Sequence, residues 1–333
     1  MGATKNLAIE ENEKFTDEAQ QFSNQEQEES PRYKLIGKLM RREIHLSYSK
    51  LKHLSSPVNF IDAILNPPKR NAGMSLGTLV DCLLLTEDKF DEQFTVIDET
   101  PTTDKQTEFV TLVFEKMKLE PISNLDAKFA EAVSEGFGRV KTDQLKPYII
   151  ATLQGKECIS KSDFSKAKKI VDNLKNTAEI TDELMLVEEF QKKLEFNYKG
   201  WNFLCYLDTY HKDGFDDLKF ASDCSYEKFS RDIEKFGYDI QIGVYAIGFE
   251  ALHGNFHPTV KHIVYDAIGN YGVYPIDSSY VDYCKRKVDF LIACLEKMIS
   301  ENAYDKSYNF FRKNNTIYKP KWASGFDMTM FED

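Results

Sequence analysis

The feature that most constrains the fold is a stretch of alternating apolar and polar residues in the middle of the chain. It runs from Val187 to Phe220 as VEEFQKKLEFNYKGWNFLCYLDTYHKDGFDDLKF. A period of two is typical of strands with one buried face, and the interruptions NYKGW and HKDG have the composition of turns. We therefore predict three antiparallel strands within residues 187–220.

The residues that follow alternate between helical and strand patterns. Residues 225–252 predict one long helix with an internal Gly237, and TVKHIVYD and YGVYPID predict two further strands. An amphipathic pattern over residues 277–299 predicts a closing helix. Residues 187–333 therefore have the order βββ-α-ββ-α, which indicates an α/β core with a central mixed sheet flanked by helices.

The part before this core, residues 32–186, has mainly helical periodicity. We predict a helix that opens at Ser47 and stops before Pro57, a second that ends at Pro67, and a third, strongly apolar one over residues 75–90. FTVID, from Phe94, predicts a short strand. We expect this part to be a mostly helical N-terminal region that packs on the core at 187–333.

The first 31 residues differ in composition from the rest. They are rich in Glu, Gln, Asn and Ser and carry a net charge of −6 out of −11 for the whole chain. A segment of this kind buries little apolar surface, so we predict a disordered acidic tail over residues 1–31. The remaining 302 residues are only mildly acidic, so the global charge weakens a nucleic-acid partner without excluding one.

Composition also indicates the compartment. No apolar run approaches the ~18 residues of a membrane span, and the N-terminus has no secretory signal pattern. The six cysteines are scattered, mostly in apolar runs, and none belongs to a Cys-x-x-Cys pair. We expect reduced, buried cysteines in a cytoplasmic protein without a zinc or iron–sulfur site.

Two carboxylates and a lysine fall together on the predicted strands. Asp208 lies near the end of one strand, and Asp217 and Lys219 lie two residues apart on the next, which places them on the same side. Carboxylate oxygens suit Mg²⁺ or Mn²⁺. We predict a metal site at Asp208 and Asp217, with Lys219 orienting a water or offsetting phosphate charge; the alternative is a surface hairpin with solvated charges.

Further site residues come from the flanking elements. A third acidic group is expected on the preceding strand, where we favour Glu189, with Glu188 and Glu195 as alternates. Gln241 and Tyr245 are four residues apart and share one helical face. These two are either polar residues of the core or groups that face the site and contact phosphate.

The ordered set of an acidic residue, Asp208, Asp217-x-Lys219 and a helical Gln-x-x-x-Tyr resembles the PD-(D/E)xK nuclease superfamily. The match is most similar to the RecE-like phage and prophage exonucleases of the exodeoxyribonuclease VIII type. LSYSKLKHLSSPVNF, GTLVDCLLL with FDEQFTVID, DLKF, YDIQIGVYAIG and YKPKWAS carry the likeness over about residues 45–325.

The resemblance implies a restriction-endonuclease-like core and Mg²⁺- or Mn²⁺-dependent hydrolysis of DNA phosphodiesters. By similarity, Asp208 and Asp217 match metal-binding carboxylates, Lys219 the catalytic lysine, and Gln241 and Tyr245 the Gln-x-x-x-Tyr motif. It also implies digestion of double-stranded DNA ends from 5′ to 3′ in a bacterial or phage-infected cell, a single-strand annealing protein as partner, and a ring-shaped homo-oligomer.

One position departs from the family pattern. The family commonly has a histidine in the G-T-x-x-H helix, whereas Gly77-Thr78-Leu79-Val80 is followed here by Asp81. Asp81 is expected to replace that histidine as a metal ligand. The departure also leaves open a DNA-end-binding protein with weakened cleavage, and the superfamily leaves open an endonuclease or a helicase-linked nuclease.

Removal of residues 1–31 tests the predicted acidic tail. The truncated protein should fold and keep its activity, because this segment cannot bury apolar area. It should also bind DNA slightly more tightly, since six net negative charges are lost. Circular dichroism and a DNA-binding titration of both proteins check this, and an insoluble or inactive truncation would contradict it.

Overall fold

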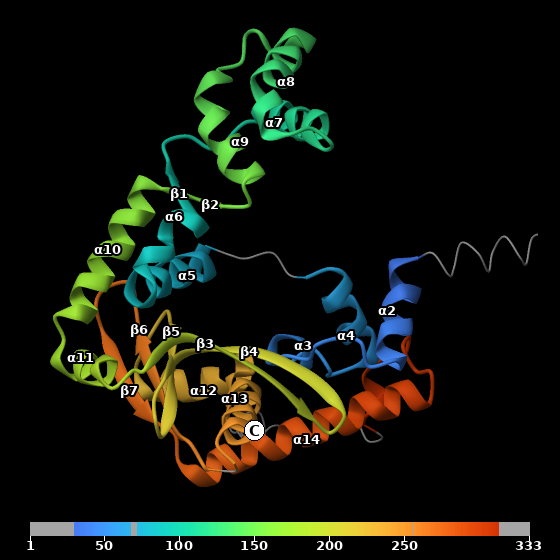
Figure 1. Cartoon of the computed structure of the whole chain (residues 1–333), viewed down its shortest axis with the longest axis vertical. Coiled ribbons are helices and arrows are strands. Elements are labelled where there is room, and N and C mark those ends of the chain that lie inside the picture. The colour runs from blue at the N-terminus through green and yellow to red at the C-terminus, as the bar shows by residue number, and fades with distance from the viewer. Residues whose placement is uncertain (1–29, 68–71, 255, 313–333) are drawn as a thin grey trace, which may run out of the picture. The chain divides into compact units, whose positions relative to one another are not determined.

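The computed structural model describes residues 30–67, 72–254 and 256–312. The predicted tail over residues 1–31 lies almost entirely outside this range, as does the YKPKWAS segment. The chain forms two compact units (Figure 1). We call residues 1–68, 197–203 and 286–333 unit 1, and residues 69–196 and 204–285 unit 2. The domain boundaries expected from the sequence stay predictions.

Unit 1 is built from short helices with clear sequence signals. Ser56 accepts a hydrogen bond from the backbone N–H of Asn59, and Pro57 occupies the first helical position. Pro57 therefore begins a helix. The indole of Trp201 is fully buried and donates to Glu296 at 2.7 Å. The helices are α2 Pro31–Met40, α3 Tyr48–Leu51, α4 Pro57–Leu65, η5 Tyr308–Phe310 and the C-terminal part of α14 Ser278–Ser300.

The first two predicted strands form a hairpin that both units share. β3 Glu189–Tyr198 and β4 Trp201–Tyr210 are joined by Lys199 and Gly200, which have φ angles of 49° and 79°. Positive φ at both central residues suits a two-residue hairpin turn whose twist matches that of the strands. NYKGW is therefore a turn, as its composition predicts.

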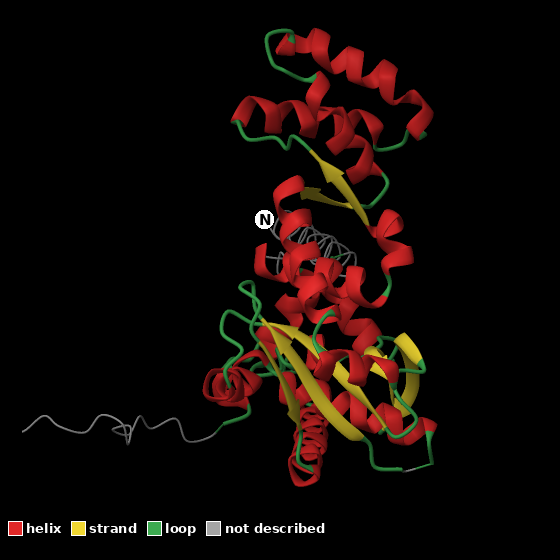
Figure 2. Cartoon of the chain, turned by 90° about the vertical axis from the view of Figure 1, so that its left-hand side faces the viewer, coloured by secondary structure: helices red, strands yellow, loops and turns green. Residues whose placement is uncertain are grey.

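The third predicted strand belongs to a different ladder. β5 Gly214–Phe220 pairs in parallel with β6 Thr259–Tyr265, and β7 Tyr271–Pro275 pairs antiparallel with β6. The expectation of three antiparallel neighbours is thus wrong for β5, whereas the mixed sheet is confirmed. β4 reaches β5 largely through Thr209, whose hydroxyl accepts from the Asp216 N–H at 2.9 Å and donates to its carbonyl. Figure 2 shows the strands in yellow.

The predicted long helix after β5 is two helices. α12 Tyr226–Phe236 ends at Gly237, which has a φ of 76° and opens α13 Tyr238–Leu252. A left-handed glycine is the usual end of a helix, which is why the pattern breaks here. α13 is buried continuously over residues 239–249, so its polar residues lie in the interior.

The N-terminal part of unit 2 is mostly helical, as predicted. Phe94–Ile97 forms the expected strand β1, which pairs in parallel with β2 at Glu157–Ser160, a strand that the sequence did not reveal. A separate small core gathers around Phe109, Val113 and Phe129. The helices are α5 Ala72–Leu85, η1 Glu87–Lys89, α6 Phe90–Gln93, α7 Asp104–Met117, η2 Ile122–Asn124, α8 Leu125–Ala132, η3 Val133–Phe137, η4 Asp143–Leu145, α9 Lys146–Leu153, α10 Lys161–Lys175 and α11 Ala178–Met185.

A close approach of α5 to β5 brings the two halves of unit 2 together. A Cβ placed on Gly77 would lie 3.1 Å from Cβ of Phe220, which is tighter than an ordinary contact. Glycine at this position lets the helix backbone pass near the strand. The apolar core behind it includes Leu79, Val80 and Leu218. Asp81 is carried on α5, and this packing directs that helix toward the strand of Asp217 and Lys219.

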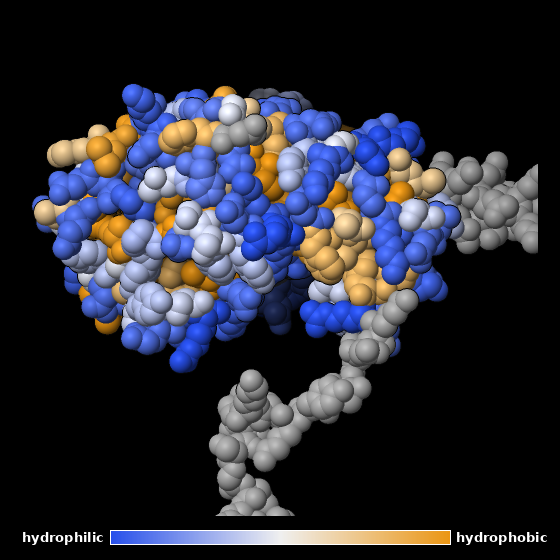
Figure 3. Space-filling model, turned by 90° about the horizontal axis from the view of Figure 1, so that it is seen from below, coloured by the Kyte–Doolittle hydropathy of each residue, from blue (hydrophilic) through white to orange (hydrophobic). Residues whose placement is uncertain are grey.

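The helices and the cysteines bear on the environment that the sequence predicts. Among the described residues, no helix has both the length and the apolar character that crossing a membrane requires. Hydrophilic and hydrophobic residues are mixed over the face drawn in Figure 3. The six cysteines are free, and all except the half-buried Cys158 are buried. This agrees with the expectation of reduced, mostly buried thiols.

A side chain larger than glycine at position 214, the start of β5, should destabilise the protein. A Cβ there would overlap the backbone carbonyl of Thr259 on β6, so Gly214→Ala must displace the strand that carries Asp217. We expect a loss of about 1–3 kcal/mol in the free energy of unfolding. Gly138→Ala is the control, because nothing lies within 4 Å of its added Cβ and its φ is −59°. If urea unfolding showed the same change in the free energy of unfolding for both variants, the steric role of Gly214 would be contradicted.

Candidate active site

The centre of the site is an ion pair between two residues of β5. Asp217 is 1% exposed, and its carboxylate pairs with the ammonium group of Lys219. The Lys219 Nζ also lies 3.3 Å from the Leu218 carbonyl and 4.9 Å from the centre of the Tyr238 ring. Burial opposes ionisation of Asp217, but Lys219 and His262 outweigh it and lower the pKa of this carboxyl. Asp217 is therefore a carboxylate at neutral pH.

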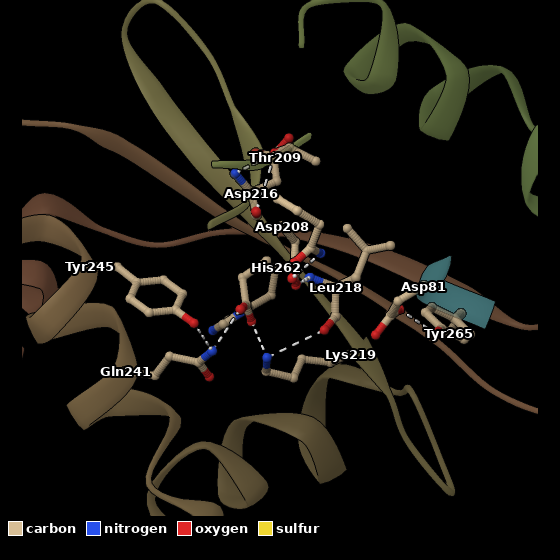
Figure 4. Close-up of polar contacts among 12 residues, drawn as sticks. Asp81, Asp208, Thr209, Asp216, Leu218, Lys219, Gln241, Tyr245, His262 and Tyr265 are labelled. Carbon is tan, nitrogen blue, oxygen red and sulfur yellow. Dashed lines mark hydrogen bonds and ion pairs between the residues drawn. The ribbon is translucent and has the colours of Figure 1, made fainter. Parts of the chain in front are cut away.

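Helix α13 supplies the two residues of the Gln-x-x-x-Tyr pattern. The Gln241 Nε2 donates to Oδ1 of Asp217 at 2.9 Å and to the Tyr245 hydroxyl at 2.9 Å. Both side chains are buried, and Figure 4 shows them pointing toward Lys219. The helical spacing thus brings Gln241 and Tyr245 to the site, where Gln241 contacts the carboxylate directly.

A histidine that sequence reasoning missed completes the surroundings of Asp217. His262 on β6 is the parallel register partner of Asp217, and its Nδ1 lies 3.2 Å from Oδ2 of that residue. Its ring is completely buried. A histidine inside the apolar run of TVKHIVYD was the available signal, but only the parallel pairing of β5 with β6 places it here.

Asp208 approaches β5 from the end of β4. Its Oδ2 accepts the backbone N–H of Leu218 at 2.9 Å, and its Oδ1 accepts from Nε2 of Gln191 at 3.0 Å. Burial and the charge of Asp217 raise the pKa of Asp208 to about 6, although Lys219 and these hydrogen bonds oppose the rise. Asp208 and Asp217 are therefore close enough to repel each other, as the sequence predicts.

Asp81 joins the same group from α5. Its Oδ1 accepts a hydrogen bond from the Tyr265 hydroxyl at 2.9 Å (Figure 4). Burial and the charge of Asp208 raise the pKa of Asp81 well above its ordinary value; Asp217 adds to the rise, while Tyr265 and Lys219 oppose it. Asp81, Asp208 and Asp217, which the sequence analysis names as candidate ligands, come from three different elements and lie within electrostatic range of one another.

The structure does not bring the preferred acidic residue of β3 to this group. Glu189 is exposed and pairs with Lys192 at 2.5 Å, while Glu195 pairs with Lys193 at 2.9 Å. Glu188 uses its backbone N–H to bond the Tyr210 carbonyl. Gln191, with a φ of 52°, is the β3 residue that contacts Asp208. This left-handed residue interrupts the regular alternation of the strand that Glu189 opens.

The donor chemistry of the group fits a hard divalent cation. Carboxylate oxygens are the ligands that Mg²⁺ and Mn²⁺ prefer. Oδ2 of Asp217 is buried and contacts Lys219 and His262 without a hydrogen bond of good geometry. Within the described ranges, however, no three acidic, histidine or cysteine side chains already converge as a metal cluster. Lys219 is paired with Asp217, so the three carboxyl groups would have to rearrange to share one cation.

Three comparisons with known proteins bear on the family of this chain. Residues 47–304 match the family described as "PDDEXK-like domain of unknown function (DUF3799)". The chain therefore belongs to this family and has the fold of the PD-(D/E)xK nuclease superfamily. A crystal structure of a candidate exonuclease from Eubacterium rectale is similar with a TM-score of 0.47 and 13% identity, over 83% of this chain and 90% of that one. The comparison with curated proteins finds no match.

The raised pKa of Asp208 predicts how stability depends on pH without metal. The folded pKa is about 6, whereas the unfolded value is about 4. The stability contributed by Asp208 is therefore fully present below pH 4 and is lost as the pH rises through 6. Asp208→Asn should unfold at higher urea than the parent at pH 7, with a smaller difference at pH 4. Measurements in EDTA check this.

Asp213→Asn is the control for this pH series. Asp213 is an exposed carboxylate in the turn between β4 and β5, so this substitution should follow the parent at every pH. If Asp208→Asn and the parent show the same pH dependence, the electrostatic account of the carboxylate group is wrong.

Proposed function

We propose that the protein is a divalent-metal-dependent DNA nuclease. The observation that carries this proposal is the buried Asp217–Lys219 pair on β5 with Asp208 and Asp81 beside it. Strongly shifted carboxylates gathered on different elements are costly to the fold, and such groups are concentrated at functional sites. Membership of the PD-(D/E)xK-like family supports the same reaction.

Asp208, Asp217 and Asp81 are the residues that would hold Mg²⁺ or Mn²⁺. When bound, such an ion lowers the pKa of a water ligand and stabilises the charge that develops on the phosphate. The raised pKa values of Asp81 and Asp208 fit this role, because a cation would offset the burial and the repulsion that favour the protonated forms of these groups.

Lys219 and the α13 pair have distinct tasks in this proposal. The Lys219 ammonium lies beside the carboxylates and orients the attacking water or offsets charge on the attacked phosphate. Gln241 holds Oδ1 of Asp217, and Tyr245 holds Gln241 in turn. Gln241 thus acts chiefly by fixing a metal-binding carboxylate, which is a supporting contact of the kind that metal sites depend on.

The finer assignment follows the RecE-like pattern in the sequence. It comprises exonucleolytic digestion of double-stranded DNA ends from 5′ to 3′, delivery of the exposed 3′ strand to a single-strand annealing protein, and a ring-shaped homo-oligomer. What supports this assignment is the resemblance of Asp208, Asp217-x-Lys219 and Gln241-x-x-x-Tyr245 to the RecE-like exonucleases. The second candidate is a DNA-end-binding protein with weakened cleavage, which Asp81 favours because it stands where the family commonly has histidine.

A nuclease assay on linear and closed circular DNA, with Mg²⁺ and with EDTA, tests the proposed function. The parent should degrade linear DNA only with Mg²⁺ and spare the circles. Asp217→Asn should abolish cleavage and leave the protein folded, because the substitution keeps the shape but removes the charge. Asp213→Asn, an exposed neighbour, is the control and should be fully active. Degradation of the circles would favour an endonuclease, and parental activity in Asp217→Asn would refute the site.

Asp81 decides between the two candidate functions. Asp81→Ala should lower activity by about 100-fold, the size expected when a metal ligand or its support is lost. Asp81→His should keep partial activity with a preference shifted toward Mn²⁺, since imidazole is a softer donor. The deciding measurement is a crystal structure soaked in Mn²⁺. Metal density without an Asp81 oxygen in its first or second coordination shell would rule out the ligand role.

A further inference from the structure

His262 is a buried histidine whose ring lies beside a carboxylate but makes no hydrogen bond of good geometry to the described residues. Its side chain is 0% exposed, and neither ring nitrogen makes a hydrogen bond of good geometry within the described part of the chain. Burying an unsatisfied polar group costs about 1–3 kcal/mol. A leucine or phenylalanine would suit this place in the core of β6 better, so the imidazole calls for a functional explanation.

The carboxylate of Asp217 is the polar group at contact distance from this ring. The His262 Nδ1 lies 3.2 Å from Oδ2 of Asp217, and the two residues are register partners on parallel strands. The ring is held on its apolar sides, because Phe229 packs edge-on at 5.4 Å and Tyr238 lies 6.2 Å away between ring centres. The backbone ladder and these aromatic contacts therefore fix where Nδ1 points.

His262 and Gln241 contact opposite ends of the same carboxylate. Gln241 donates to Oδ1 from α13, while Nδ1 of His262 faces Oδ2 from β6, the oxygen that also pairs with the Lys219 ammonium. A carboxylate that is contacted at both oxygens cannot turn freely about its Cβ–Cγ bond. The two residues therefore fix the plane of Asp217 from two elements that are distant in sequence.

We infer that His262 is a positioning residue for the metal-binding carboxylate of Asp217. This inference rests on the proposed function and adds a residue to its site. His262 acts through Asp217 rather than on DNA, because its side chain is fully buried. Its contribution is to hold Oδ2 oriented for a cation, so that the loss of the Nδ1 contact weakens metal binding and leaves DNA binding unchanged.

A pair of substitutions separates positioning from filling of the core. The carboxamide nitrogen of asparagine stands two bonds from Cβ, as Nδ1 does, so His262→Asn can keep the contact with Asp217. His262→Leu fills the space without a donor. Binding of MnCl₂ is measured by isothermal titration calorimetry, stability by thermal unfolding in EDTA, and kcat and KM on linear duplex DNA.

The Asn variant should bind Mn²⁺ within about threefold of the parent, and the Leu variant should bind about 10- to 100-fold more weakly, with KM for DNA unchanged in both. The matched control is His211→Leu. His211 is also buried and lies 2.7 Å from a carboxylate, that of Asp216, the neighbour of Asp217 on β5. This control should lower thermal stability and leave Mn²⁺ affinity unchanged.

The inference would be overturned if His262→Leu bound Mn²⁺ as tightly as the parent does. It would also be overturned if His262→Asn, or the control His211→Leu, lost as much Mn²⁺ affinity as His262→Leu. If the Leu variant fails to fold, His262→Gln replaces it, because its amide nitrogen stands one bond further from Cβ, and the same loss is expected. If the parent bound no Mn²⁺, the proposed metal site itself would be wrong. If the parent bound Mn²⁺ and the His262 variants bound it equally well, only the role of His262 would be wrong.

Discussion

The structure depends on keeping the carboxylate of Asp217 charged while it is 1% exposed. An unpaired buried carboxylate is too costly to persist, so compensating groups must be delivered to it. Lys219 comes from the same strand, Gln241 from α13, and His262 from the parallel neighbour β6. The parallel pairing of β6 with β5 and the packing of α13 are therefore needed to stabilise this one charge.

Asp81 and Asp208 are two further buried carboxyl groups near Asp217, and their burial is unfavourable. Burial raises the pKa of both groups, and a neighbouring charge adds to the rise: that of Asp208 for Asp81 and that of Asp217 for Asp208. Lys219 and the hydrogen bonds of the two groups only partly offset this. A fold selected for stability alone would not gather these charges. A cation bound by these carboxylates would lower the electrostatic cost of burying them. The unfavourable electrostatics of the metal-free site are thus linked to its proposed chemistry.

Local spacing was sufficient for part of the site. Asp217 and Lys219 share a side of one strand, and Gln241 and Tyr245 share a face of one helix, so period two and period 3.6 placed them correctly. The expectation of a third acidic residue at the start of β3 did not place Glu189, which is exposed and pairs with Lys192. Gln191 adopts a φ of 52° and interrupts the strand. The sequence does not predict this irregularity, because glycine or asparagine, and not glutamine, usually occupies a left-handed conformation.

The sequence by itself determined the mixed α/β class, the helical N-terminal half and the order of the acidic and lysine residues, because these follow from periodicity within single elements. The tertiary structure decided which elements meet. It paired β5 in parallel with β6, which put His262 opposite Asp217, and it laid α5 close to β5 at Gly77, which directed Asp81 to the site. Such contacts join residues far apart in the chain, and their register depends on the packing of the whole core.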